Sequence, residues 1–160
     1  MEKLIIRKLN SDEYHLLEDF LYEAVFQDPA KPLPRSVVNE PEMSAYIQDF
    51  GRPHDNCLVA VLRGSIVGAV WTRIISGEVQ GYGYVDDKTP EFAISVNKNY
   101  RGLGIGTQLM YSMIGLLKEN GYHRVSLSVQ KANRAVKLYR TLGFEVFKEQ
   151  GEELLMVLKL

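Results

Sequence analysis

Apolar residues recur along this chain with two different periods, and these periods predict where helices and strands lie. In residues 11–25 the apolar positions fall every three or four residues, which predicts an amphipathic helix capped by Ser11. Three later stretches have the same period and predict helices over residues 42–50, 105–117 and 133–142. Gly121 and Gly143 are expected to end the last two, because glycine readily takes the left-handed conformation that closes a helix.

Short apolar runs rich in β-branched residues predict the strands. They cover residues 4–8, 58–62, 66–75, 92–96, 125–129, 144–147 and 154–158. Arg63-Gly64-Ser65 separates the second run from the third and predicts a hairpin, and the last two runs are expected to pair in the same way. Residues 77–85, which include Gly81 and Gly83, are predicted to form a loop or a ragged strand.

The order of these elements indicates the fold class. One strand and two helices come first, antiparallel strands follow, and the second half alternates between strands and helices. This order is typical of an α/β domain with a mixed sheet. A chain of 160 residues is long enough for one such domain, so we expect residues 1–160 to fold as a single unit.

Composition and charge argue against several classes of protein. The net charge is −1, from 19 basic and 20 acidic side chains, so nothing suggests the basic face that nucleic acid requires. No apolar run approaches the roughly 20 residues that span a membrane, and the N-terminus is too short and too charged for a signal peptide. The lone Cys57 excludes an intramolecular disulfide, and His15 and His54 lack partners at metal-ligand spacing. We therefore expect a cytoplasmic protein with no metal site.

A glycine cluster at the start of the third predicted helix is the most informative stretch. The strand over 92–96 leads into Arg101-Gly-Leu-Gly-Ile-Gly106, and the helix follows. Glycines let the backbone approach a ligand closely, and a helix N-terminus offers unpaired N–H groups with partial positive charge, which suits a phosphate. The spacing fits neither a dinucleotide loop nor a Walker loop. A glycine-rich turn that holds no ligand is the alternative interpretation.

Two motifs in this half of the chain resemble one known family. Arg101-x-x-Gly104-x-Gly106 is similar to the R/Q-x-x-G-x-G/A signature of the GNAT superfamily of N-acetyltransferases. The stretch from Asn133 through Tyr139 to Gly143-Phe144 resembles the second coenzyme motif of that family, at the right distance downstream. The C-terminal half carries the resemblance, whereas the first 55 residues match only in general layout.

The resemblance implies a fold and a coenzyme site. It implies a mixed sheet of about six to seven strands flanked by about four helices, in which the strands over 92–96 and 125–129 splay apart to admit acetyl-CoA. Residues 90–147 would bind the coenzyme and residues 1–85 the acceptor. The implied coenzyme contacts are Ile94, Ser95, Val96, Arg101, Gly102, Leu103, Gly104, Ile105, Gly106, Thr107, Asn133 and Lys137. Three of these have simpler interpretations: Arg101 could bind nearby carbonyls, Asn133 could be a helix cap, and Lys137 a solvated lysine.

Transfer of an acetyl group to an amine needs a base for the amine and an acid for the leaving thiolate. Glu91, just before the central strand, is the leading candidate for the base, with Asp86, Asp87 and Glu78 as alternatives. Tyr139 is the candidate acid, because a phenol is a proton donor with a reference pKa near 10. A solvated carboxylate and a packing tyrosine are the simpler interpretations of these two residues.

The expected function is the transfer of an acetyl group from acetyl-CoA to a primary amine, with a small-molecule acceptor favoured. The alternatives are acetylation of a protein N-terminus or lysine, and a module that binds acetyl-CoA without catalysis. The acceptor should meet the first half of the chain, where several side chains could line a cleft: Tyr46, Phe50, Trp71, Arg73, Tyr82 and Tyr84. A homodimer is left open.

Overall fold

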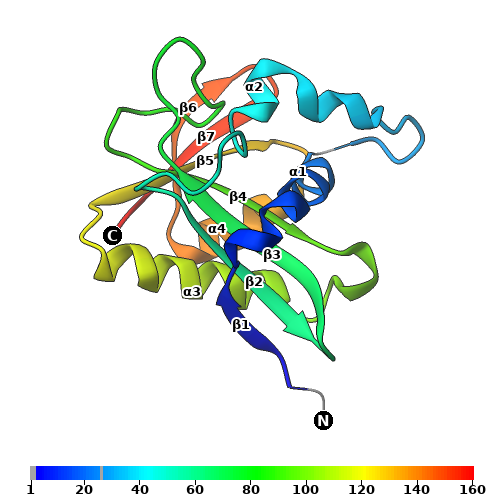
Figure 1. Ribbon diagram of the computed structural model, residues 1–160. Coiled ribbons are helices and arrows are strands. Elements are labelled where there is room, and N and C mark those ends of the chain that lie inside the picture. The colour runs from blue at the N-terminus through cyan, green and yellow to red at the C-terminus, as the bar shows by residue number, and fades with distance from the viewer. Residues whose placement is uncertain (1–2, 26) are drawn as a thin grey trace.

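A computed structural model describes residues 3–25 and 27–160, and it contains a seven-stranded sheet (Figure 1). The strands are β1 (Ile5–Lys8), β2 (Asn56–Leu62), β3 (Ser65–Arg73), β4 (Glu91–Val96), β5 (Arg124–Gln130), β6 (Glu145–Gln150) and β7 (Glu153–Lys159). Their order across the sheet is β1-β2-β3-β4-β5-β7-β6. Only the β4–β5 pair among these strands is parallel, so the predicted mixed α/β sheet is confirmed.

In the described residues, four α-helices and three short 3-10 helices accompany the sheet. The α-helices are α1 (Leu17–Ala24), α2 (Pro41–Ser44), α3 (Ile105–Glu119) and α4 (Ala135–Leu142). The 3-10 helices are η1 (Ser11–Leu16), η2 (Arg35–Asn39) and η3 (Lys98–Tyr100). No helix in the described ranges is both long and apolar enough to cross a bilayer.

Two helix predictions need correction. The first helix is capped by Asn10 rather than Ser11, because the Asn10 N–H donates to Glu13 Oε1 at 2.9 Å, and its first turns are 3-10. The helix expected over 42–50 ends at Ser44. Beyond it, Arg73 Nη1 binds the carbonyl oxygens of Ala45 at 3.0 Å and Gln48 at 2.8 Å, so a distant strand fixes a turn where a helix was predicted.

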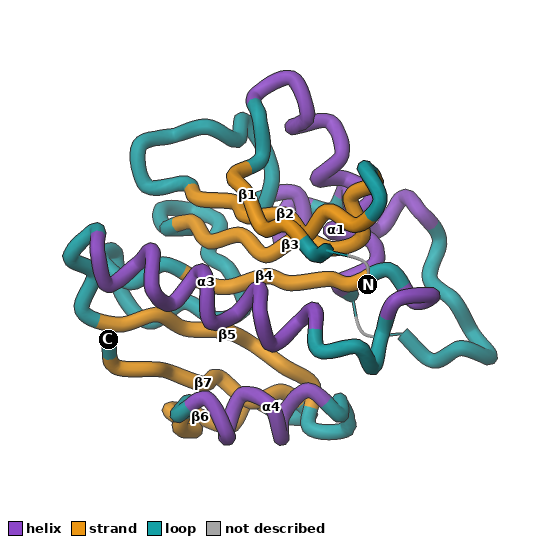
Figure 2. Tube along the Cα trace, turned by 90° about the horizontal axis from the view of Figure 1, so that it is seen from below, coloured by secondary structure: helices purple, strands orange, loops and turns teal. Residues whose placement is uncertain are grey.

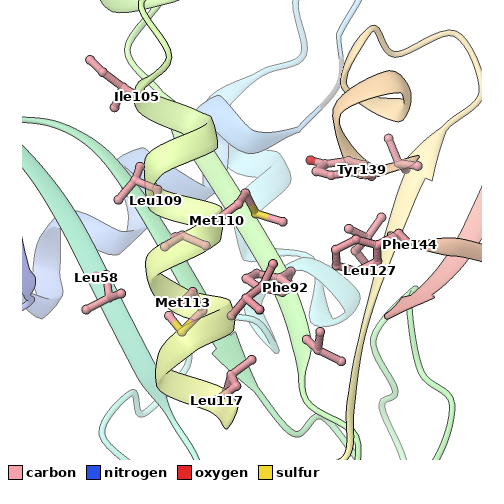
Figure 3. Close-up of a cluster of buried hydrophobic side chains, with 14 of the residues drawn as sticks. Leu58, Phe92, Ile105, Leu109, Met110, Met113, Leu117, Leu127, Tyr139 and Phe144 are labelled. Carbon is pink, nitrogen blue, oxygen red and sulfur yellow. The ribbon is translucent and has the colours of Figure 1, made fainter. Parts of the chain in front are cut away.

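Each face of the sheet has its own hydrophobic core. On one face α3 and α4 pack against alternate strand residues, including Phe92 (Figure 3). On the other face η1, α1 and the segment around Tyr46 pack around Trp71. Neighbouring residues of a strand point to opposite faces, so Phe92 belongs to the first core and Ala93 to the second.

The parallel pair at the centre of the sheet separates along its length. Glu91 and Ser126 form the one registered pair between β4 and β5 in the described chain, supported by the Ser126 N–H, which donates to the Pro90 carbonyl at 3.0 Å. Figure 2 shows the two strands diverging from there. The predicted splayed strands are therefore present, and they form a V whose apex lies at Glu91 and whose open end faces the glycine cluster.

Candidate active site at the splayed strands

Glu91 lies at the apex of the V and is almost completely buried. The residue is 2% exposed, and neither carboxylate oxygen has a hydrogen-bond partner of normal geometry among the described residues. Phe92 faces the α3 side of β4, so Glu91 faces the α1 side together with Ala93 and Ser95. The structure therefore excludes the interpretation of Glu91 as a solvated carboxylate at the strand end.

A short glycine-containing segment, residues 81–83, covers the apex. It belongs to the stretch 77–85, which is a loop rather than a strand. A Cβ added at Gly81 would lie 2.1 Å from Glu91 Oε2, and one added at Gly83 would lie 3.1 Å from the β5 backbone at Leu127. Ser126 Oγ donates to the Gly83 carbonyl at 2.6 Å and holds this segment on β5. Both glycines are thus needed for close approach to the split strands.

Burial dominates the electrostatics of Glu91. It raises the pKa of the carboxyl group from 4.5 to about 7, because the charged form loses its water. The hydroxyl of Tyr46 and the backbone of Gly83 lie close enough to lower that pKa in part, although neither makes a hydrogen bond of normal geometry. A carboxyl group with this pKa can exchange a proton near neutral pH.

The alternative carboxylates have other surroundings. Asp86 pairs with Arg124 at 2.6 Å, and this hydrogen bond is the main cause that lowers the pKa of Asp86 to about 2. Asp87 accepts a hydrogen bond from the Tyr84 hydroxyl at 2.6 Å, and Glu78 is exposed in the loop. None of the three shares the buried apex with Glu91.

The glycine cluster lies at the open end of the V and begins α3. Gly102 has φ 79° and Gly104 has φ 81°, which is the left-handed region that favours glycine. A Cβ at either position would meet nothing within 4 Å, so open space adjoins this turn. The backbone N–H groups from Gly102 to Thr107 have no acceptor within the described chain. Free donors at a helix N-terminus suit a phosphate.

Three side chains predicted to contact the coenzyme, those of Arg101, Asn133 and Lys137, also fit the simpler interpretations given above. Arg101 Nε donates to the Val96 carbonyl at 3.0 Å, which fixes the turn after β4. Asn133 Oδ1 accepts the Ala135 N–H at 2.9 Å and so caps α4. Lys137 is exposed on α4, and the described residues offer it no ion pair. The coenzyme contacts of these side chains stay a prediction.

Tyr139 approaches the V from the other face of the sheet. Its side chain is 7% exposed, and its ring packs against Phe144 at 5.9 Å between centroids. Burial raises the pKa of its hydroxyl to about 12. Figure 3 shows the hydroxyl pointing away from Phe144 and toward the side of α3 and β4. It makes no hydrogen bond with another described residue. Because its pKa is about 12, the phenol is protonated near neutral pH.

Two further features adjoin the site. A cleft of about 350 Å³ lies on the α1 face and is lined by Phe20, Ile66 and Ser95, among others. Its charged lining residues are Glu23, Lys98 and the mutually paired Asp19 and Arg35. No group of three His, Cys, Asp or Glu residues within 3–25 and 27–160 is arranged to hold a metal ion. Of the residues around Glu91, Tyr46 was expected only as one of several cleft side chains, and Gly81 only as part of a loop.

Comparisons with known proteins agree on one family. The sequence model of the acetyltransferase (GNAT) family matches residues 18–144. The chain is 36% identical over 95 residues to the mycothiol acetyltransferase of Thermobifida fusca, and this match covers 56% of this chain and 28% of that protein. It is 32% identical over 80 residues to the L-methionine sulfoximine/L-methionine sulfone acetyltransferase of Pseudomonas aeruginosa, covering 44% of this chain and 46% of that protein. The chain thus spans less than half the length of these curated relatives.

A solved structure shows the same fold over the whole chain. The PaiA N-acetyltransferase of Thermoplasma acidophilum, crystallised in complex with coenzyme A, superposes with a TM-score of 0.72 and covers 99% of both chains. Its sequence identity is 17%, so this likeness establishes the fold alone.

Proposed function

The chain belongs to the acetyltransferase (GNAT) family, and we propose that it transfers an acetyl group from acetyl-CoA to the primary amine of a small molecule. The observation that carries this proposal is Glu91, a buried carboxylate at the apex of two splayed strands. In the described part of the chain its oxygens have no hydrogen-bond partner of normal geometry. An alkyl amine has a pKa near 10.4 and must lose a proton to become a nucleophile. A carboxyl group whose pKa is about 7 is suited to take that proton.

The open end of the V fits the coenzyme. Acetyl-CoA supplies an acetyl group activated as a thioester. The free N–H groups from Gly102 to Thr107 would hold its pyrophosphate, and the left-handed glycines keep side chains out of that space. The β4 residues Ile94, Ser95 and Val96 have no partner strand on the β5 side among the described residues, so their backbone is available to the pantetheine arm. Arg101, Asn133 and Lys137 border the same end.

The two candidate catalytic groups flank the gap from opposite faces of the sheet. Glu91, on the α1 face, accepts a proton from the ammonium group, and the neutral nitrogen then bonds to the acetyl carbon. Tyr139, on the α4 face, donates its proton to the sulfur as the carbon–sulfur bond breaks. Since the pKa of Tyr139 is about 12, the phenol is protonated whenever Glu91 is ionised near neutral pH. The cycle closes when Glu91 and the new amide nitrogen each release a proton to solvent and the phenolate regains one from solvent.

The small-molecule class is supported by the relatives. The names of two of them contain mycothiol and L-methionine sulfoximine or sulfone, which are small molecules. In the cleft on the α1 face Asp19 and Arg35 pair with each other, which leaves the carboxylate of Glu23 and the cation of Lys98 for a compact acceptor that bears both charges.

The test is a panel of amines, scored by thiol release from acetyl-CoA. One arm contains amino acids and their derivatives, including methionine sulfoximine and methionine sulfone, and the other contains peptides with free N-termini or lysines. Turnover confined to the first arm supports the proposal, whereas turnover confined to peptides indicates a protein acetyltransferase. If acetyl-CoA binds but no amine raises thiol release above that of Glu91→Gln, the chain is a binding module.

A further inference from the structure

Tyr46 lies in the turn after α2 and reaches the apex of the V from the α1 face. Its side chain is 8% exposed, and its hydroxyl oxygen accepts the Tyr82 N–H at 2.9 Å. Tyr82 stands between the two glycines that cover Glu91. We propose that Tyr46 is a positioning residue for Glu91, which directs its hydroxyl proton to the carboxylate and holds residues 81–83 over the split strands. This inference rests on the proposed role of Glu91 as the base.

The strand next to β4 fixes the backbone of Tyr46. Trp71 Nε1 donates to the Tyr46 carbonyl at 3.1 Å, and Arg73 Nη1 binds the carbonyls of Ala45 and Gln48. The sheet register pairs Trp71 with Ala93 and Arg73 with Glu91. Trp71 and Arg73, which hold the turn, are therefore cross-strand neighbours of Ala93 and Glu91. The position of Tyr46 is fixed relative to Glu91 for this reason.

The direction of the Tyr46 proton follows from hydrogen-bond accounting. A phenol has one proton to donate, and its oxygen already accepts the Tyr82 N–H. The Glu91 oxygens are the neighbouring acceptors that lack a partner. The two groups also influence each other. Burial raises the pKa of Tyr46 most, and Glu91 raises it further. Burial also raises the pKa of Glu91 most, and Tyr46 lowers it in part.

Other charges around the apex are already paired. Arg73 is fully buried and binds Asp55 at 2.6 Å, and Arg124 is paired with Asp86. Burial, the Tyr46 hydroxyl and the Gly83 backbone are the influences on the protonation of Glu91. Removing the Tyr46 hydroxyl should therefore leave Glu91 harder to ionise, and this consequence is measurable.

The experiment compares Tyr46→Phe with Tyr111→Phe, which makes the same change on an exposed tyrosine of α3. The acid limb of the pH profile of kcat/KM should move upward by about one pH unit in Tyr46→Phe, because the proposed donor to the charged form of Glu91 is removed. It should not move in Tyr111→Phe. In the Glu91→Gln background, Tyr46→Phe should cause little further loss of kcat, because Tyr46 acts through Glu91.

A second readout does not depend on activity. Carbon NMR of glutamate carboxyl groups, with the Glu91 signal assigned from the Glu91→Gln spectrum, should show the same upward movement in the titration of Glu91. An unchanged titration in folded Tyr46→Phe overturns the role of Tyr46 and leaves the proposed function intact. The proposed role of Glu91 as the base would be contradicted instead if Glu91→Gln turned over as fast as the native chain. If Tyr46→Phe does not fold, 3-fluorotyrosine at position 46, a stronger donor, must lower the pKa of Glu91, and an unchanged pKa overturns the proposal.

Discussion

The Glu91 carboxylate rests directly against the α-carbon of Gly81. A Cβ at position 81 would lie 2.1 Å from Glu91 Oε2 and 2.6 Å from Oε1, distances that no side chain can occupy. The backbone of Gly81 is not in the left-handed region, so the requirement for glycine comes from this contact rather than from conformation. The candidate base and the loop that covers it are thus fitted to each other.

We expect Gly81→Ala to destabilise the protein by about 1–3 kcal/mol, the usual cost of overpacking a buried site. The loop must move away from Glu91 or the carboxylate must leave the apex, so turnover should fall as well. Denaturant unfolding measures the first effect. The matched background is Glu91→Ala, which removes the atoms in conflict. If Gly81→Ala is as destabilising in that background as in the native chain, the contact is not the cause.

The buried carboxyl group also predicts how stability depends on pH. Because folding raises the pKa of Glu91 from 4.5 to about 7, the folded protein keeps a proton that the unfolded chain loses between those values. This contribution to stability is full below pH 4.5 and is lost as the pH rises to about 7. The difference in pKa corresponds to about 3 kcal/mol. In Glu91→Gln this fall should be absent, so the variant gains stability relative to the native chain from pH 4.5 to 7.

Chemical denaturation at several pH values between 4 and 8 measures this difference. A constant gap in unfolding free energy between Glu91→Gln and the native chain would show that Glu91 titrates alike in both states. Its burial would then have no bearing on proton transfer.

Much of this architecture was readable from the sequence, because it depends on local properties. Periodicity indicated the strands and the two α-helices of the second half, and the glycine turn before α3 needs only backbone geometry. The apex was not readable, because it joins Tyr46, Gly81 and Glu91 through tertiary contacts with no common motif. The prediction of a helix over 42–50 was wrong for the same reason, since Arg73 donates to carbonyl oxygens that would accept hydrogen bonds within a helix.

The glycine turn gives a prediction about the coenzyme. Gly104 has φ 81°, so Gly104→Val places a branched side chain in a strained conformation, and in the space expected to hold the pyrophosphate. We expect acetyl-CoA affinity to fall about tenfold or more by calorimetry, which corresponds to a loss of at least about 1.4 kcal/mol. Gly104→Asn separates the two causes, because asparagine tolerates the left-handed region while still adding a side chain.

Gly115→Ala is the control within the same helix. Nothing lies within 4 Å of a Cβ at Gly115, and alanine is the better helix former. This variant should gain about 0.5–1 kcal/mol of stability with unchanged affinity. Normal affinity in both folded variants of Gly104 would remove the pyrophosphate from this turn.

Tyr139 offers the sharpest test of the chemistry, because its hydroxyl has no hydrogen-bond partner among the described residues. The ring belongs to the core and packs against Phe144, while the hydroxyl points toward the side of α3 and β4 (Figure 3). Tyr139→Phe therefore keeps the packing and removes only the proton donor. We expect the melting temperature and the affinity for acetyl-CoA to stay nearly unchanged.

Turnover of Tyr139→Phe should fall by roughly ten- to a thousandfold, a range that overlaps the usual contribution of one acid–base group. The pH profile separates this role from that of Glu91. Since the pKa of Tyr139 is about 12 and that of Glu91 about 7, the loss in Tyr139→Phe should be the same from pH 6 to 9, whereas the loss in Glu91→Gln should shrink as free amine accumulates at high pH. Thiol release and calorimetry on one preparation supply both quantities. Unchanged turnover would mean that solvent protonates the sulfur and that Tyr139 serves the core alone.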